Sequence, residues 1–157
     1  MQGTLGRRHL WEARSVSTLV PWSVSQEAAV TGGSEVAVAV SVSHDVLADV
    51  RAYVNRHLPK VGRILAFSAL PGPGPAVVRD ADHALSLAQA LALALRTERT
   101  AEERRETVHL FVAGPAGFSF LLGQQAQSFG LVVVYEYDFE SNAPGAYEPG
   151  IRLPEKP

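Results

Sequence analysis

Apolar runs alternate with amphipathic segments along most of this chain. The apolar runs are short and rich in Val, Ala, Leu and Phe, which predicts strands buried on both faces; they are residues 35–43, 62–70, 107–113 and 131–137. The segments between them place apolar residues at helical spacing; they are residues 44–58, 83–95 and 118–129. This order predicts an α/β fold of Rossmann-like design, in which helices cover both faces of a mostly parallel sheet.

Several residue types that favour helix ends lie where the predicted helices begin and end. Ser43 is a candidate N-cap for the first helix, and Asp80 and Asp82 are candidates for the second. Gly130 follows the third helix and is predicted to end it in the left-handed αL conformation. The charged residues 96–106 are predicted to be the solvated end of the second helix.

The two ends of the chain lack the alternation. Residues 1–34 are predicted to be an N-terminal flank or linker, with Ser15–Val24 as a candidate extra strand, and residues 35–157 are predicted to be the Rossmann-type domain. The last residues, 142–157, are rich in Pro and Gly and are predicted to form an irregular wrap.

The composition of the chain argues against several classes of protein. The chain has 157 residues, of which 46% are hydrophobic and 19% charged, so it has enough apolar surface to fold. A formal net charge of −2 argues against a protein that grips duplex nucleic acid through many phosphates. There is no cysteine, which excludes disulfides, thiolate nucleophiles and cysteine-based zinc sites. No cluster has metal-ligand spacing, and no apolar run predicts a signal peptide or membrane span, so we expect a cytoplasmic protein.

A ligand site is predicted at one edge of the sheet. In open parallel sheets, ligands bind beyond the carboxyl ends of the strands, where helices begin. The predicted ligand-binding residues at these ends are Ser43, His44, Asp45, Pro71, Gly72, Gly114, Pro115, Ala116, Gly117, Phe118, Ser119 and Glu136.

The turn at residues 114–119 carries the most information among these. Its small residues let the backbone approach a ligand closely, and the amides of a helix's first turn suit phosphate. The turn matches neither the dinucleotide pattern GxGxxG nor the phosphate-loop pattern GxxxxGK[ST]. The alternative is a tight strand-to-helix connection with no ligand.

The consecutive residues Ser43, His44 and Asp45 resemble a catalytic trio only in composition. Neighbours at a helix start point in different directions and form no relay, so no catalytic residue is predicted. Either Ser43 caps the helix and Asp45 complements its dipole, or His44 or Asp45 contacts a ligand. His109 lies within a strand and is predicted to be a packed core residue, and core or partner packing is favoured for Trp22 over base stacking.

Two stretches resemble a known family. VAVAVSVSHDVLADVRAYV resembles the strand and helix that open the conserved part of SAVED domains. HLFVAGPAGFSFLLGQQAQSFGLVVVYEYDFESNAPGAYEPGIRLP resembles that family's closing segment, with its apolar strand, Pro-containing turn, LLG step, Tyr-Glu strand end and Tyr-x-Pro tail.

The resemblance implies a CARF-like ligand sensor without catalysis of its own. SAVED domains bind a cyclic di- or trinucleotide in the CBASS type of bacterial antiphage defence, oligomerise, and switch on a nuclease, protease or TIR effector. On the matching positions, the ligand would lie over the turn at 43–45, the loop at 71–74 and the helix start at 114–119.

The chain departs from this family in one respect. Members commonly carry two fused CARF-like halves behind an effector domain, whereas this sequence predicts about one unit. We therefore expect an excised domain, or a stand-alone sensor that pairs with itself or with an effector chain. The alternatives are a ring nuclease or other hydrolase on the same scaffold, and a protein scaffold without a small ligand.

Overall fold

The computed structural model describes residues 14–19, 21–137 and 147–153 of the chain. In chain order the elements are β1 (Arg14–Leu19), β2 (Trp22–Ala28), β3 (Glu35–Ser41), α2 (Leu47–His57), β4 (Val61–Ala69), α3 (Ala81–Glu98), α4 (Ala101–Arg104), β5 (Val108–Ala113), α5 (Ala116–Gln125), the 3₁₀ helix η1 (Ala126–Phe129), β6 (Val132–Tyr137) and β7 (Tyr147–Leu153). In this part of the chain, no helix combines the length and apolar character needed to cross a bilayer.

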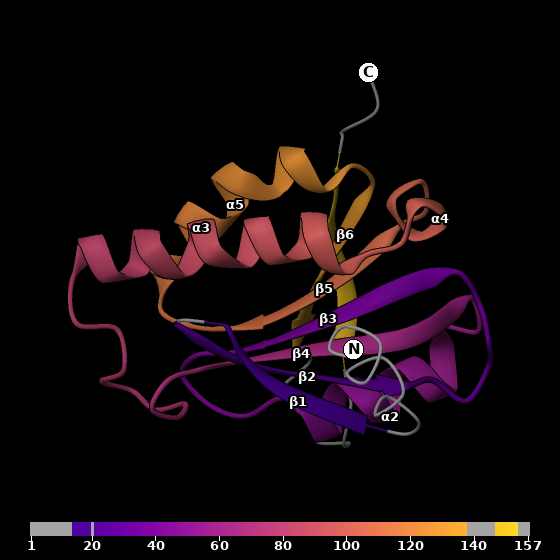
Figure 1. Cartoon of the computed structure of the whole chain (residues 1–157), viewed down its shortest axis with the longest axis horizontal. Coiled ribbons are helices and arrows are strands. Elements are labelled where there is room, and N and C mark those ends of the chain that lie inside the picture. The colour runs from indigo at the N-terminus through magenta and orange to yellow at the C-terminus, as the bar shows by residue number, and fades with distance from the viewer. Residues whose placement is uncertain (1–13, 20, 138–146, 154–157) are drawn as a thin grey trace, which may run out of the picture.

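One seven-stranded sheet organises the molecule, in the order β1-β2-β4-β3-β5-β6-β7. The four central strands, β4, β3, β5 and β6, run parallel, and they correspond to the four predicted from the sequence. The outer strands β1, β2 and β7 join in antiparallel fashion. Helices α3 and α5 lie over one face and α2 lies over the other (Figure 1). The predicted α/β architecture is confirmed.

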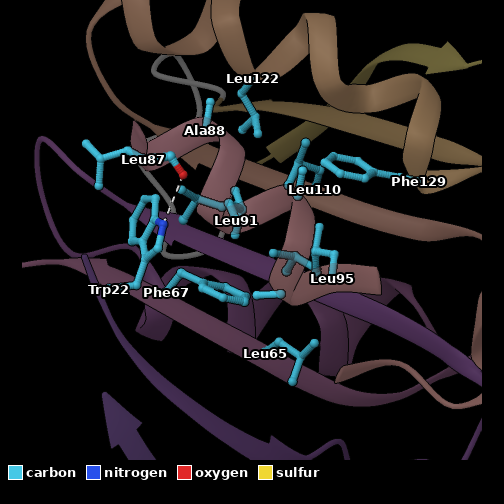
Figure 2. Close-up of a cluster of buried hydrophobic side chains, with 14 of the residues drawn as sticks. Trp22, Leu65, Phe67, Leu87, Ala88, Leu91, Leu95, Leu110, Leu122 and Phe129 are labelled. Atoms are coloured by element: carbon cyan, nitrogen blue, oxygen red, sulfur yellow. Dashed lines mark hydrogen bonds between the residues drawn. The ribbon is translucent and has the colours of Figure 1, made fainter. Parts of the chain in front are cut away.

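Alternating side chains of the central strands supply two apolar cores. On β3, the valines at 36, 38 and 40 face α3 and α5, whereas the alanines at 37 and 39 face α2. Leu87, Leu91 and Leu95 form the buried stripe of α3 against the larger core (Figure 2). Full burial of each such side chain contributes roughly 1.5–3 kcal/mol. The packing of α3 on the sheet is thus set by its 3.6-residue period.

Trp22 belongs to the larger core, as predicted. It is fully buried, and its indole Nε1 donates a hydrogen bond to the Leu87 carbonyl oxygen at 3.0 Å (Figure 2). Its ring centroid lies 5.9 Å from that of Phe67 and 6.0 Å from that of Phe118. One residue of β2 therefore contacts β4, α3 and α5 at once.

The sheet extends further at both ends than the sequence predicted. In place of a single candidate strand at Ser15–Val24, the structure has the two strands β1 and β2, and β2 pairs with β4. The irregular wrap predicted for residues 142–157 is wrong for Tyr147–Leu153, which form β7 against β6. The division of the chain at residue 34 stays a prediction, since residues 1–13 lie outside the described part.

Two sequence predictions about helix starts had different outcomes. Ser43 as N-cap of the first helix is wrong, because α2 begins four residues later, at Leu47. The Ser41 hydroxyl and the Asp45 carboxylate instead accept the Val46 and Leu47 amides, each at 3.0 Å. Asp80 is confirmed as the N-cap of α3, where its Oδ1 accepts the His83 amide at 2.8 Å. Gly130 follows η1 with the predicted positive φ, 84°, but its ψ of −127° lies outside the predicted αL region.

The predicted solvation of residues 96–106 is wrong for Arg99. This side chain is 3% exposed, and it donates to the carbonyl oxygens of Leu95 at 2.9 Å and Phe129 at 3.1 Å. Burial lowers the pKa of Arg99, and the neighbouring Arg104 lowers it further. The guanidinium thus stabilises two helix ends through their last carbonyl groups.

The chain makes a close backbone contact where β3 and β4 begin. A Cβ added to Gly33 would lie 1.9 Å from the Lys60 carbonyl oxygen, and one added to Gly62 would lie 1.9 Å from the Gly33 carbonyl oxygen. The Glu35 amide donates to the same Lys60 oxygen at 2.9 Å. Only residues without a side chain fit at 33 and 62.

Candidate functional site

Three of the predicted loops are joined at the carboxyl edge of the sheet, at the left of Figure 1. The amides of Val42 and Ser43 donate to the Ala113 carbonyl oxygen at 2.8 and 2.9 Å, which ties the β3–α2 turn to the end of β5. The Gly74 amide donates to the Val42 carbonyl oxygen at 2.9 Å, which adds the loop after β4. The structure therefore brings the predicted segments 43–45, 71–72 and 114–119 to one rim.

The topology places a crevice at this rim. From β3 the chain passes through α2 on one face to β4, and from β4 it crosses through α3 on the other face to β5. The connections that leave the adjacent strands β3 and β5, through α2 and α5, thus lie on opposite faces of the sheet. Ligands of open α/β sheets bind at such a switch point, here between β3 and β5.

The start of α5 has the features of an anion site. Its N-cap is Pro115, no side chain caps its amides, and no acidic residue lies in its first turn. Pro115, Ala116, Gly117 and Ser119 are exposed. The uncapped amides and the helix dipole both favour a negative group, although the dipole alone is worth only roughly 0.3–1 kcal/mol.

Packing requires a glycine at one of the two glycine positions of this turn but not at the other. A Cβ on Gly114 would lie 2.9 Å from Phe118 Cδ2 and 3.4 Å from Val42 Cβ, so packing accounts for that glycine. A Cβ on Gly117 would meet nothing within 4 Å. Glycine in an exposed helix costs about 1 kcal/mol relative to alanine, and packing gives no reason for it at 117.

Phe118 contributes only its backbone to this rim. Its side chain is fully buried in the core beside Trp22. The predicted contact of Phe118 with a ligand is therefore limited to its main-chain atoms. The backbone of Glu136 lies in β6, but its side chain falls outside the described residues, so its role stays a prediction.

The trio after β3 forms no catalytic relay, as predicted. The Ser43 hydroxyl lies 3.3 Å from His44 Nδ1, while Asp45 accepts the Leu47 amide instead of orienting the imidazole. His44 and Asp45 are both exposed at the rim. With Asp45 bonded to the backbone, nothing orients the imidazole to activate the serine.

Two hollows continue the rim along the start of α3. The loop hollow, of about 430 Å³, is lined by the predicted residues Pro71 and Gly72 together with Leu70, Gly74, Pro75, Ala76, Val77, Arg79 and His83. The helix hollow, of about 810 Å³, is lined by Pro21, Leu70, Arg79, Asp80, Asp82, His83, Ser86, Gln89, Ala90 and Leu93. Sequence reasoning missed the residues of α3, although a helix that starts beyond a strand tip is itself a signal for them.

A second cluster of polar side chains lies toward the opposite edge of the sheet, near the amino end of β3. His109 Nδ1 is 2.6 Å from the Tyr135 hydroxyl, and its Nε2 is 2.7 Å from Glu35 Oε1. His109 and Tyr135 are 6% and 5% exposed, and Glu35 is the first residue of β3. Burial, with a smaller contribution from Tyr53, raises the pKa of Tyr135 well above its usual range. This buried network supports the prediction that His109 is a core residue.

Comparisons with known proteins agree with the geometry. The family model of the SMODS-associated and fused to various effectors sensor domain, SAVED, matches residues 4–153. CD-NTase-associated protein 4 of Enterobacter hormaechei subsp. hoffmannii (strain UCI 50) is 31% identical over 133 residues, which cover 85% of this chain and 26% of that protein. The chain thus spans about a quarter of that curated relative.

Solved structures share the fold. The Acinetobacter baumannii Cap4 SAVED/CARF-domain receptor with the cyclic trinucleotide 3′3′3′-cAAA superposes with a TM-score of 0.61 at 15% identity, over 90% of this chain and 29% of that one. The same receptor with 2′3′3′-cAAA gives 0.58 at 16% identity, over 84% and 27%. At these identities the likeness is one of architecture.

Proposed function

Since the chain belongs to the SAVED family of sensor domains, we propose that it binds a cyclic di- or trinucleotide at the carboxyl edge of its sheet. Bound ligand would favour oligomerisation, and the oligomer would activate an effector in CBASS antiviral defence. The receptor that shares this fold was solved with cyclic trinucleotides, which supports the ligand class.

The uncapped start of α5 is the observation that carries the proposal. It stands at the switch point between β3 and β5, with no acidic residue in its first turn and with an exposed glycine at 117. A phosphodiester of the ligand ring fits the amides of Ala116 and Gly117. The other proposed contacts are Ser43, His44, Asp45, Pro71, Gly72, Gly114, Pro115, Ser119, the Phe118 backbone and Glu136.

Catalysis belongs to the effector in this proposal. The relative named CD-NTase-associated protein 4 is about four times longer than the segment that it shares with this chain. A linked or partner domain of nuclease, protease or TIR type would carry out the reaction that binding switches on. The sensor acts only through the difference in ligand affinity between its free and assembled states.

Calorimetry with Gly117→Asp tests the site. The wild-type chain is titrated with cyclic di-, tri- and tetranucleotides, and at least one is expected to bind. Gly117→Asp should weaken that binding more than about tenfold, because a carboxylate at the first turn repels the phosphodiester. The fold should survive, since the position is open and aspartate complements the helix start.

Gly123→Asp is the matched control. It adds the same charge on α5 at another glycine whose Cβ would meet nothing within 4 Å, and its binding should equal that of the wild type. Equal loss in both variants, or none in Gly117→Asp, would move the ligand away from this turn. No binding of any cyclic nucleotide would refute the sensor function, and linear products after incubation would identify a ring nuclease instead.

A further inference from the structure

The helix hollow adjoins the loop hollow, which contains the proposed ligand contacts Pro71 and Gly72. It shares Leu70, Arg79 and His83 with the loop hollow, and the Gly74 amide fixes that loop to the Val42 carbonyl group at the strand tips. A ligand that holds a phosphodiester at the start of α5 can therefore extend along the rim toward α3. The volume of about 810 Å³ lies within the range of about 300–1,000 Å³ for small-molecule sites.

The hollow offers both an apolar surface and a polar edge. Leu93 is 53% exposed, and it lines the hollow together with Leu70 and Pro21. Asp82, Gln89 and Leu93 share one face of α3, because Gln89 follows Asp82 by seven residues and Leu93 follows Gln89 by four. A flat aromatic ring can pack on the apolar part while its edge meets the polar side chains.

The polar groups have complementary hydrogen-bonding chemistry. The Asp82 carboxylate only accepts hydrogen bonds, whereas the Gln89 amide both donates and accepts. A glutamine amide of this kind pairs with the amino and ring nitrogens of adenine. An exocyclic amine carries two N–H donors, which suit the acceptor oxygens of both side chains.

Two further donors lie between the hollows. Arg79 lines both and carries a guanidinium suited to phosphate. His83 also lines both, and its Nδ1 accepts the Arg79 amide at 3.1 Å. The neutral ring therefore carries its proton on Nε2, which makes that nitrogen a donor.

We infer that the helix hollow receives one base of the cyclic oligonucleotide, and that Gln89 and Asp82 select a base with an exocyclic amine. The phosphate next to that base lies on Arg79 and His83. This inference rests on the proposed function, and it adds to it the residues that decide which nucleotide is sensed.

The test compares cyclic triadenylate with cyclic tri-inosinate, in which a carbonyl group replaces each exocyclic amine. Calorimetry of the wild-type chain should show about tenfold tighter binding of the adenylate ring. Gln89→Ala should lose about tenfold in affinity for the adenylate ring and little for the inosinate ring. Asp82→Asn should likewise reduce the preference, and both variants change exposed helix positions, so they should keep the wild-type melting temperature.

Gln124→Ala is the matched control, because Gln124 is exposed on α5 and lines neither hollow. It should bind both rings like the wild type. If the wild-type chain binds cyclic nucleotides but Gln89→Ala matches Gln124→Ala with both rings, the base site is refuted and the sensor function stands. If the wild type binds neither these two rings nor any other cyclic nucleotide, both fail together.

Discussion

Tyr135 shows how a single side chain is held inside the sheet. Its hydroxyl lies 2.6 Å from His109 Nδ1, and the other ring nitrogen lies 2.7 Å from a Glu35 carboxylate oxygen. With the ring proton on Nε2, the imidazole donates to Glu35 and accepts from Tyr135, so all three groups are satisfied. This arrangement favours the protonated phenol.

The raised pKa of Tyr135 predicts loss of stability in alkali. Its ordinary pKa is 10.0, and burial raises the value in the folded protein. Below pH 10 both states keep the proton and the stabilisation is complete; above pH 10 only the unfolded chain releases it, so the free energy of unfolding falls. The fall approaches about 1.4 kcal/mol per pH unit for this one group.

Urea denaturation from pH 8 to pH 11 measures this effect. Tyr135→Phe should show a shallower decline above pH 10 than the wild type, although at pH 8 it should be about 1–3 kcal/mol less stable because His109 loses its partner. Identical slopes in the two proteins would mean that other groups cause the alkaline transition.

Sequence alone could predict the burial of His109 but not its partners. A polar residue within an apolar strand indicates a core position by its pattern. Glu35 is 74 residues away and Tyr135 is 26 residues away, and only the strand order places them beside the ring. Phe118 is a similar case, since its position at a helix start suggested the rim while its side chain packs in the core.

At the scale of elements, the close contact before β3 predicts a sharp difference between adjacent glycines. Gly33→Ala places a Cβ 1.9 Å from the Lys60 backbone oxygen, and a backbone atom cannot move aside as a side chain can. The variant should lose about 3 kcal/mol of unfolding free energy. Thermal and urea denaturation measure the loss.

Gly32→Ala is the neighbouring control. A Cβ at this position would meet nothing within 4 Å, so the stability should change by less than about 0.5 kcal/mol. Equal effects at the two positions would contradict the close approach of the segments that lead into β3 and β4.

The four central parallel strands were predictable and the antiparallel strands outside them were not, for physical reasons. Parallel strands are covered on both faces, so they appear in the sequence as nearly continuous apolar runs. β2 mixes buried and partly exposed residues without a continuous apolar run, and β7 contains Pro149 and Gly150, which are typical of loops. Proline is tolerated there because β7 is an edge strand. The late start of α2 was also not predictable from local pattern. The Ser41 hydroxyl and the Asp45 carboxylate accept the backbone amides at this helix start, a role that the sequence had suggested for Ser43.

For the whole molecule, the proposed function predicts a change of assembly state. A ligand that binds the oligomer better than the free chain must shift the population toward the oligomer. Mass photometry of the wild type should show larger species after addition of the cyclic nucleotide that calorimetry identifies. Gly117→Asp should remain at its ligand-free mass, and an unchanged mass of fully liganded wild type would refute signalling by assembly.

The sequence was sufficient to predict that the site lies at the carboxyl edge of the sheet. It was not sufficient to predict that the site extends along α3. The rule for parallel sheets identified the three loops that the backbone hydrogen bonds of Val42, Ser43 and Gly74 hold together. The two hollows depend on how α3 lies against Pro21 and Leu70, which belong to segments far apart in sequence. Such long-range packing is decided by the complete fold and not by local pattern.

The place of Trp22 gives the molecule an intrinsic optical probe. The indole donates to an α3 carbonyl group and lies 6.0 Å from Phe118, the residue next to Gly117. Its emission therefore depends on the environment that α3 and α5 create around the indole. The chain has only two tryptophans, so replacing Trp11 with phenylalanine would leave a single indole that reports on helix positions without any attached dye.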